Sequence, residues 1–252
     1  MCEQQGFREC GSREDALDLP PFFRAVALGE GGEAFAHACK IAAAQGAGTL
    51  VHVETAAWAD FALVLEPDEP VVTARRALHA GMLALANTLA ALAPPEKPIA
   101  LRWPDALVVD GGLVGGGRLG CPEGSDENAV PSWLVFAAKL RLRFPPGVEP
   151  GRFPTVTSLD EEGFGAMSGA RLAEGFARHF MMLVDSWQQD GFGAVAQGYL
   201  DRLPRRAGER ANLAANGDLL IERDRRAGER HSLRAALRKP SWLAAETGDP
   251  GL

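Results

Sequence analysis

Cysteine is scarce in this sequence and never occurs in a pairing pattern. Only four of the 252 residues are cysteine, at positions 2, 10, 39 and 121, and no two of them form a Cys-x-x-Cys motif. Disulfide frameworks and zinc sites need closer, paired spacing, so we expect free thiols in a reducing cytoplasm. The five histidines are equally isolated, without His-Glu-x-x-His spacing, so no metal site is expected from them.

Long hydrophobic runs and an excess of positive charge are also missing. Residues 1–18 are polar, lack the apolar core of a signal peptide and are predicted to be a flexible tail. Residues 77–93 carry no formal charge but are rich in alanine, short of the ~20 strongly apolar residues of a membrane span. The net charge is −7. We therefore expect a soluble globular protein that binds neither membranes nor nucleic acid.

Motifs of the common hydrolases and nucleotide-binding proteins are missing too. No Gly-x-Ser-x-Gly motif occurs, and Ser158 and Ser168 have no evident catalytic partners. The run "RWPDALVVDGGLVGGGRLG" (102–120) holds six glycines, but no Lys-Ser or Lys-Thr follows them as a Walker A loop requires. A dinucleotide-binding loop would open a helix, whereas this run continues into Pro122 and an acidic loop. A β-hairpin turning at Gly111-Gly112 is the preferred interpretation.

The apolar pattern divides the chain into short strands and amphipathic helices. Helices are predicted at 33–45, 73–93, 171–189 and 194–203, and strands at 25–28, 48–55, 61–67, 99–103, 106–110, 113–119 and 132–144. Several strand pairs have no helix between them, and only residues 56–60 separate the second strand from the third. This order predicts an α+β fold with a mixed β-sheet backed by helices.

The composition changes after residue 203. The hexamer RRAGER occurs at 205–210 and at 225–230, on either side of a predicted turn at 216–218, which indicates a β-hairpin. We expect a flexible tail at 1–18, a main domain at 19–203 and a small β-rich C-terminal subdomain at 204–252. Residues 201–239 contain eleven Lys or Arg against six Asp or Glu. That excess suits a solvated face or a surface for an acidic carrier domain; nucleic-acid contact is disfavoured because no interleaved aromatic residues accompany it.

Several motifs in order resemble the biotin protein ligase and lipoate ligase family. The family's Arg/Lys-Trp-Pro-Asn-Asp motif resembles Arg102-Trp103-Pro104-Asp105-Ala106, in which Asp-Ala replaces the Asn-Asp pair, and its glycine-rich return strand resembles 113–117. Residues 133–147, 157–163 and 179–203 resemble a later strand with its Pro-Gly loop, a Thr-Ser-Leu helix start, and two helices flanking a Gly-Phe pair. The resemblance covers roughly residues 25 to 203.

This resemblance implies a mixed sheet related to class II tRNA synthetases. It implies ATP-dependent activation of biotin, lipoate or another acid to an acyl-adenylate, with Mg²⁺, and transfer to a lysine of a carrier domain. The family contains dimers, so a homodimer is also implied. On this basis the expected catalytic residues are Asp105 and Arg118, and the expected substrate-binding residues are Arg102, Trp103, Gly115, Gly116, Gly117, Lys139 and Arg141.

The sequence departs from the family where the chemistry is expected. "ETAAWADF" (54–61) stands where a Gly-Arg-Gly-Arg-Arg-Gly loop would bind the adenylate, and Leu113 stands at the lysine position. "GEGGEAF" (29–35) replaces a Thr-Asn pair, and Arg141 replaces an asparagine. Losing one such donor or cation costs about 10²–10³ in rate. Two hypotheses remain: a divergent ligase, and a non-catalytic ligase-fold module that binds a small acid or an acyl-carrier domain.

Overall fold

The protein is built on a seven-stranded mixed β-sheet. A computed structural model describes residues 17–148, 153–223 and 226–244. The strand order is β1-β2-β3-β7-β6-β5-β4, and every neighbouring pair is antiparallel except β1 and β2. The strands are β1 (Arg24–Leu28), β2 (Thr49–Val53), β3 (Trp58–Leu65), β4 (Ile99–Arg102), β5 (Ala106–Val109), β6 (Gly112–Gly120) and β7 (Leu134–Arg141). The α+β fold expected from the sequence is confirmed.

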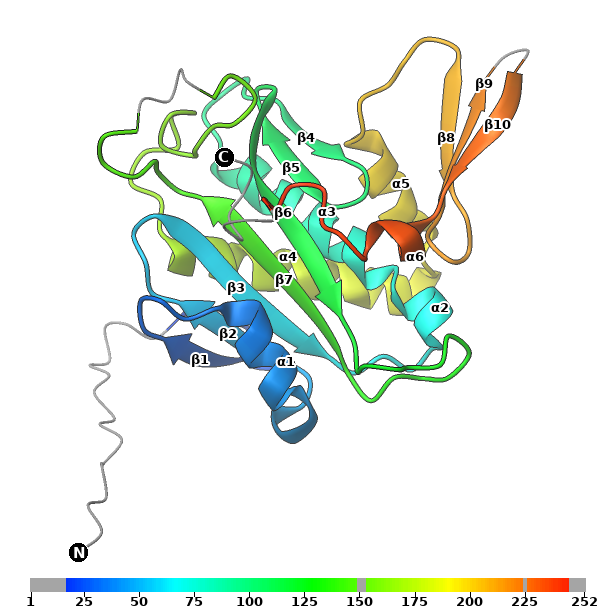
Figure 1. Ribbon diagram of the computed structural model, residues 1–252, viewed down its shortest axis with the longest axis horizontal. Helices are drawn as coiled ribbons and strands as arrows, with labels where there is room; N and C mark the ends of the chain where they lie inside the picture. The colour runs from blue at the N-terminus through cyan, green and yellow to red at the C-terminus, as the bar shows by residue number, and fades with distance from the viewer. Residues whose placement is uncertain (1–16, 149–152, 224–225, 245–252) are drawn as a thin grey trace, which may run out of the picture.

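Helices cover the two faces of this sheet unequally. One face packs against α3 (Ala77–Leu92), α4 (Gly169–Asp190) and α5 (Gly193–Asp201), where Phe61, Phe136 and Phe176 belong to the main hydrophobic core. The opposite face receives α1 (Ala34–Gln45), whose buried alanines pack on β2, β3 and β7. Figure 1 shows α1 in front of the sheet and α3 and α4 behind it. On this face of the sheet, α1 does not cover the middle of β6, and another part of the chain packs there.

The helix expected at 73–93 is interrupted. Its first turn is α2 (Val71–Ala74), which begins after Pro70, and α3 starts at Ala77. Between them the backbone N–H of Leu78 donates to Arg75 and that of His79 to Arg76, a tighter pattern than that of an α-helix. The rest of α3 is buried on nearly all sides. Among the described residues, no helix is long and apolar enough to cross a membrane.

The glycine-rich run forms the expected hairpin, but its turn is Asp110-Gly111 and not Gly111-Gly112, because Gly112 already pairs with Val109. β5 and β6 are antiparallel, and Asp110 and Gly111 at the turn have φ angles of 46° and 86°. Positive φ at both central residues is the requirement of the type I′ turn, which explains the glycine. The run of three glycines then lies in the middle of β6, next to β7.

A second, smaller sheet follows the helices. It has the order β10-β9-β8, with β8 (Glu209–Leu213), β9 (Leu219–Arg223) and β10 (Arg226–His231), and is followed by α6 (Leu233–Ala236). Figure 1 shows this sheet beside α5 and the segment after α6, in red, crossing in front of β6. The C-terminal three-stranded sheet confirms the expected β-rich segment, while its treatment as a separate domain at 204–252 stays a prediction.

Candidate functional site

The Trp-Pro-Asp turn between β4 and β5 presents a buried carboxylate. Asp105 is 2% exposed, and its backbone carbonyl accepts the N–H of Gly117 at 2.9 Å. The hydroxyl of Tyr199 on α5 donates to the carbonyl of Pro104 at 2.8 Å. These contacts fix the turn between the neighbouring strand and the helix layer. Burial raises the pKa of Asp105, and hydrogen bonds from Ser241 oppose that shift.

The partner of the Asp105 carboxylate comes from the far end of the chain. The backbone N–H of Ser241 donates to Oδ2 at 3.0 Å and its hydroxyl to Oδ1 at 2.5 Å. The next residue, Trp242, is 2% exposed, and its indole Nε1–H donates to the carbonyl of Gly117 at 2.9 Å. The segment after α6 therefore satisfies both the motif carboxylate and the glycine-rich strand.

Glycine is required in β6 because the chain packs too closely there for a side chain. A Cβ at Gly116 would lie 2.1 Å from the carbonyl oxygen of Asp105 and 2.4 Å from the Trp242 ring. At Gly115, where φ is 147°, it would lie 2.0 Å from the carbonyl oxygen of Lys139. Neither distance is possible for a real Cβ. The glycines thus allow the indole and the adjoining strands to approach, and none of them opens a phosphate-binding loop.

A cavity of about 240 Å³ lies beside the indole on the α1 side of the sheet. Its polar lining consists of Glu33, Asp60, Arg118 and Lys139; Ala137, Ala138, Trp242 and Leu243 complete its walls. Strands β3, β6 and β7 supply Asp60, Arg118 and Lys139, and Glu33 precedes α1. Cross-strand pairing places Asp60 opposite Lys139. The cavity thus combines two cations with two carboxyl groups.

The charges in the cavity are positioned by neighbours. Arg118 pairs with Glu33, and its guanidinium carbon lies 3.9 Å from the centre of the Phe35 ring. The ammonium nitrogen of Lys139 lies 5.0 Å from the centre of the Trp58 ring. Burial raises the pKa of Asp60 to about 6, although Lys139, Arg118 and the backbone N–H of Ala34 oppose the shift. Asp60 therefore changes charge near neutral pH.

The sequence-predicted site residues divide into two groups. Arg118 and Lys139 line the cavity, and Gly116 and Gly117 contact the indole beside it. Gly115 packs against β7. Asp105 does not line the cavity and is hydrogen-bonded to Ser241.

The other predicted substrate-binding residues lie away from the cavity. Arg102 is exposed and donates to the carbonyl of Gly111 at 3.1 Å. Trp103 lies against His231 of β10, with 5.7 Å between the ring centres. Arg141 is fully buried, and its guanidinium carbon lies 4.4 Å and 4.9 Å from the Trp58 and Phe144 ring centres.

Sequence reasoning missed seven residues at this site: Glu33, Asp60, Ala137, Ala138, Ser241, Trp242 and Leu243. A signal existed for Asp60, since it is a lone carboxylate in the otherwise apolar run "WADFALVL" of β3. Trp58 to Asp60 were expected to be connecting residues, and the structure places them in β3. No local pattern marks Ser241 or Trp242, because their contacts to Asp105 and Gly117 span 136 and 125 residues.

The two positions at which the resemblance implied phosphate-binding groups hold a short connection and a leucine. β2 and β3 are joined by residues 54–57 alone, and the carbonyl of Ala57 accepts the N–H of Leu142 at 2.9 Å, which ties this connection to the end of β7. Leu113 is 9% exposed and packs with Ala106 and Trp242. A short tied loop and a buried leucine therefore occupy the positions expected to bind phosphate.

Comparisons with known proteins identify the family. The model of the biotin/lipoate A/B protein ligase family matches residues 19–201, and the chain therefore belongs to that family. No curated protein sequence matches the chain.

Solved structures share the fold. A biotin protein ligase-like protein of unknown function from Silicibacter sp. TM1040 is 27% identical, with a TM-score of 0.76 over 88% of this chain and 99% of that one. Biotin protein ligase from Aquifex aeolicus is 14% identical, with a TM-score of 0.63 over 83% of this chain and 95% of that one. The Leishmania major ligase in complex with biotinyl-5-AMP is 15% identical, with a TM-score of 0.51 over 84% of this chain and 99% of that one. At this identity the two ligases show the fold alone.

Proposed function

We propose that the protein binds a small carboxylic acid, such as biotin, lipoate or a medium-chain fatty acid, in the cavity beside Trp242. The observation that carries the proposal is that Arg118 and Lys139 line one cavity. A carboxylate bound by such cations makes charge-assisted hydrogen bonds, which are stronger than neutral ones. The apolar walls formed by Ala137, Ala138 and Leu243 suit the acyl part of such a ligand.

The size of the cavity favours the acid alone. Small-molecule sites usually enclose about 300–1,000 Å³, and this cavity holds about 240 Å³. An acyl-adenylate adds a ribose, a phosphate and a base to the acid. In this conformation the cavity beside Trp242 has room for a small acid and none for an attached nucleotide.

The residues present do not fit Mg²⁺ and ATP in this conformation. The Asp105 carboxylate already accepts two hydrogen bonds from Ser241. In the part of the chain that the structure describes, no cluster of three His, Cys, Asp or Glu side chains is placed to hold a metal ion. Arg118 and Lys139 line the cavity, and Asp105 does not. This separation favours the binding module over the adenylating enzyme.

ATP-dependent ligation of the acid to a carrier-domain lysine is the second candidate. Membership of the ligase family supports it, as does the presence of one carboxylate, Asp105, in the Trp-Pro-Asp turn. It requires that the segment holding Asp105 moves away and that Arg118 or Lys139 serves in place of the missing Gly-Arg loop. The excess of Lys and Arg over residues 201–239 would offer a complementary surface to an acidic carrier domain.

Calorimetric titration with biotin, lipoate and octanoate tests the binding proposal. We expect one acid to bind, and expect Lys139→Gln to weaken it about tenfold or more, since a hydrogen bond to a charged group contributes about 1.5–3 kcal/mol. Arg102→Gln is the matched control because Arg102 lies outside the cavity, and its affinity should equal that of the wild type. If no acid binds, or if both variants weaken binding equally, the assignment of the cavity is wrong.

A further inference from the structure

We infer that Ser241 and Trp242 act as an internal ligand that closes the Asp105 side of the site, and that this segment must leave before an external ligand reaches Asp105. The inference rests on the proposed function, because it concerns access to the same face of the sheet. Residues 240–244, which include Ser241 and Trp242, form a segment that we call the C-terminal cap.

The cap occupies the groups that an external ligand would need. It supplies three donors, the backbone N–H and hydroxyl of Ser241 and the indole N–H of Trp242. They satisfy the carboxylate of Asp105, which is 2% exposed, and a backbone carbonyl on the buried part of β6. A flat aromatic ring over a glycine, with polar atoms at its edge, is also the way in which a fused-ring ligand would bind there.

The cap packs on the sheet outside the main hydrophobic core. Among the described residues, those after Ala236 belong to no named helix or strand. Trp242 packs in a small cluster with Ala106, Leu113 and Leu243 that is separate from the main core. Segments that pack outside the core open locally at lower free energy than the core does. The cap can therefore separate from β6 while the seven-stranded sheet and its helices stay intact.

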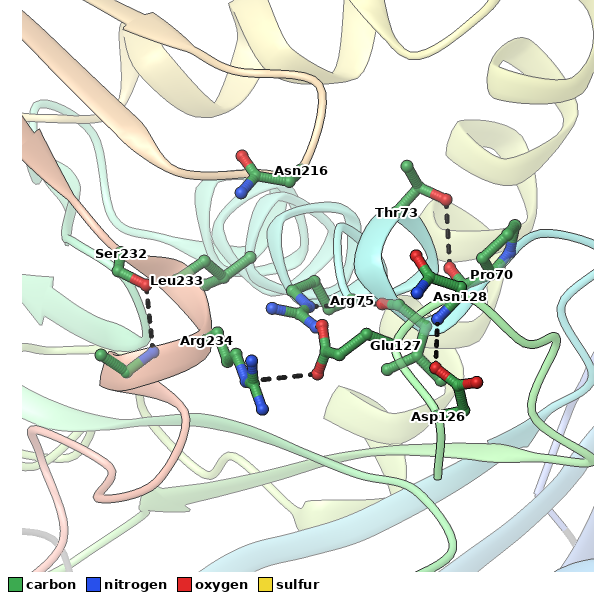
Figure 2. Close-up of polar contacts among 12 residues, drawn as sticks. Pro70, Thr73, Arg75, Asp126, Glu127, Asn128, Asn216, Ser232, Leu233 and Arg234 are labelled. Carbon is green, nitrogen blue, oxygen red and sulfur yellow. Dashed lines mark hydrogen bonds and ion pairs between the residues drawn. The ribbon is translucent and has the colours of Figure 1, made fainter. Parts of the chain in front are cut away.

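The chain just before the cap is firmly anchored. Figure 2 shows Glu127 of the acidic loop between Arg75, at the end of α2, and Arg234 of α6. The nitrogen Nε of Arg234 lies 3.3 Å from Oε1 of Glu127, and the backbone N–H of Leu233 donates to Asp218 at 2.8 Å. A short tether from this anchor keeps the opened cap close to the site, so it competes at a high effective concentration.

This arrangement predicts that closure of the cap lowers the apparent affinity of the protein for an external ligand. When only a fraction of the molecules is open, the observed dissociation constant is the intrinsic one divided by that fraction. If the cap is closed in about 90–99% of the molecules, removing it raises affinity by about ten- to a hundredfold. A wall that merely shapes the cavity would give the opposite result, because removing it takes contacts away from the ligand.

The test is titration of AMP and of biotin into wild type, Trp242→Gly and the control Met182→Ala. Met182 is 65% exposed on α4, on the opposite side of the sheet. We expect Trp242→Gly to bind AMP, biotin or both at least about tenfold more tightly than the wild type does, because its site is always open. The affinities of Met182→Ala should equal those of the wild type. Equal or weaker binding by Trp242→Gly would overturn the cap and leave the proposed function standing.

Free indole separates the two proposals if neither AMP nor biotin binds to any of the proteins. That result contradicts acid binding at the cavity for biotin, and the cap is then judged on indole alone. We expect indole to bind Trp242→Gly and not the wild type, because the space over Gly116 is shaped by the ring. No indole binding by the variant would overturn the cap.

A second variant covers the case in which Trp242→Gly does not fold. Ser241→Ala combined with Trp242→Phe keeps an aromatic ring in place and removes two of the three donors, the hydroxyl and the indole N–H. We expect a smaller gain in affinity for AMP or biotin, of about tenfold or less but above the wild type, because the closed state is weakened rather than removed. Unchanged affinity in this folded variant would also overturn the inference.

Discussion

Asp60 connects the electrostatics of the cavity to pH. It is 7% exposed in β3, opposite Lys139, and burial raises its pKa to about 6. Below that pH the carboxyl group is neutral, and Arg118 and Lys139 then dominate the charge of the cavity. Above it, Asp60 adds a negative charge to that of Glu33, and the two carboxylates repel an anionic ligand.

The affinity for an anionic acid should therefore rise as the pH falls from about 7.5 to about 5.5, a range in which an ordinary carboxylic acid stays ionised. Asp60 becomes protonated over the same range. Titration calorimetry at several pH values measures this dependence, and Asp60→Asn should abolish it. A pH dependence that persists in Asp60→Asn would assign it to another group.

Asp60 also affects stability with a defined sign. Its pKa in the folded protein lies above its ordinary value, so its contribution is present at low pH and is lost as the pH rises through about 6. Asp60→Asn should become more stable relative to wild type between about pH 4 and pH 7, by up to about 3 kcal/mol. Urea unfolding of both proteins at the two pH values checks this prediction. A stability advantage of Asp60→Asn over the wild type that becomes smaller as the pH rises would contradict it.

Among the elements, strand β6 should tolerate a substitution at Gly115 less well than the preceding turn tolerates one at Gly111. Gly115 has a φ of 147° and no room for a Cβ beside Lys139, so Gly115→Ala should cost about 3 kcal/mol or more. Gly111→Ala is the matched control: its φ is 86°, and no described atom lies within 4 Å of its Cβ position, so about 1 kcal/mol is expected. Chemical unfolding of both variants compares them, and equal losses would show that the close approach to β7 is unimportant.

Regular elements were predictable from sequence where one physical rule decided them. The β5–β6 turn was predictable because Gly111 supplies a positive φ, and α3 because its apolar residues recur at helical spacing. The start of β3 was missed because Asp60 interrupts the apolar pattern, and its burial depends on a cavity formed by three strands. The cap was missed because its position is set by contacts with Asp105 and Gly117, far away in the chain.

Across the whole molecule, His79 joins the main core to the second sheet. It is fully buried in α3, its Nε2 lies 2.9 Å from the carbonyl oxygen of Gly217, and its ring centre lies 4.4 Å from that of Tyr199. A carbonyl oxygen can only accept a hydrogen bond, so Nε2 of His79 carries the proton that is donated to it. Burial lowers the pKa of His79 to about 4. The imidazole is therefore neutral at the contact with the β8–β9 turn.

Acid should weaken this junction. A pKa lowered on folding means that the contribution of His79 is present above its ordinary value of 6.5 and is lost as the pH falls towards 4. Over that range, the free energy of unfolding of the wild type should fall by up to about 3 kcal/mol more than that of His79→Gln. Most of that loss falls between about pH 7 and about pH 4.5. Thermal or urea unfolding of both proteins at these two pH values therefore gives the comparison. An identical pH dependence in the two proteins would show that His79 does not control the junction.

The proposed activity of the molecule is binding of a small acid without adenylation, although the chain belongs to the ligase family. Pyrophosphate–ATP exchange with purified protein, Mg²⁺ and each of biotin, lipoate and octanoate distinguishes binding from adenylation. We predict no acid-dependent exchange in a sample that calorimetry shows to bind one of the acids. Exchange that depends on one acid and disappears in Asp105→Ala would contradict this prediction and establish an adenylating enzyme.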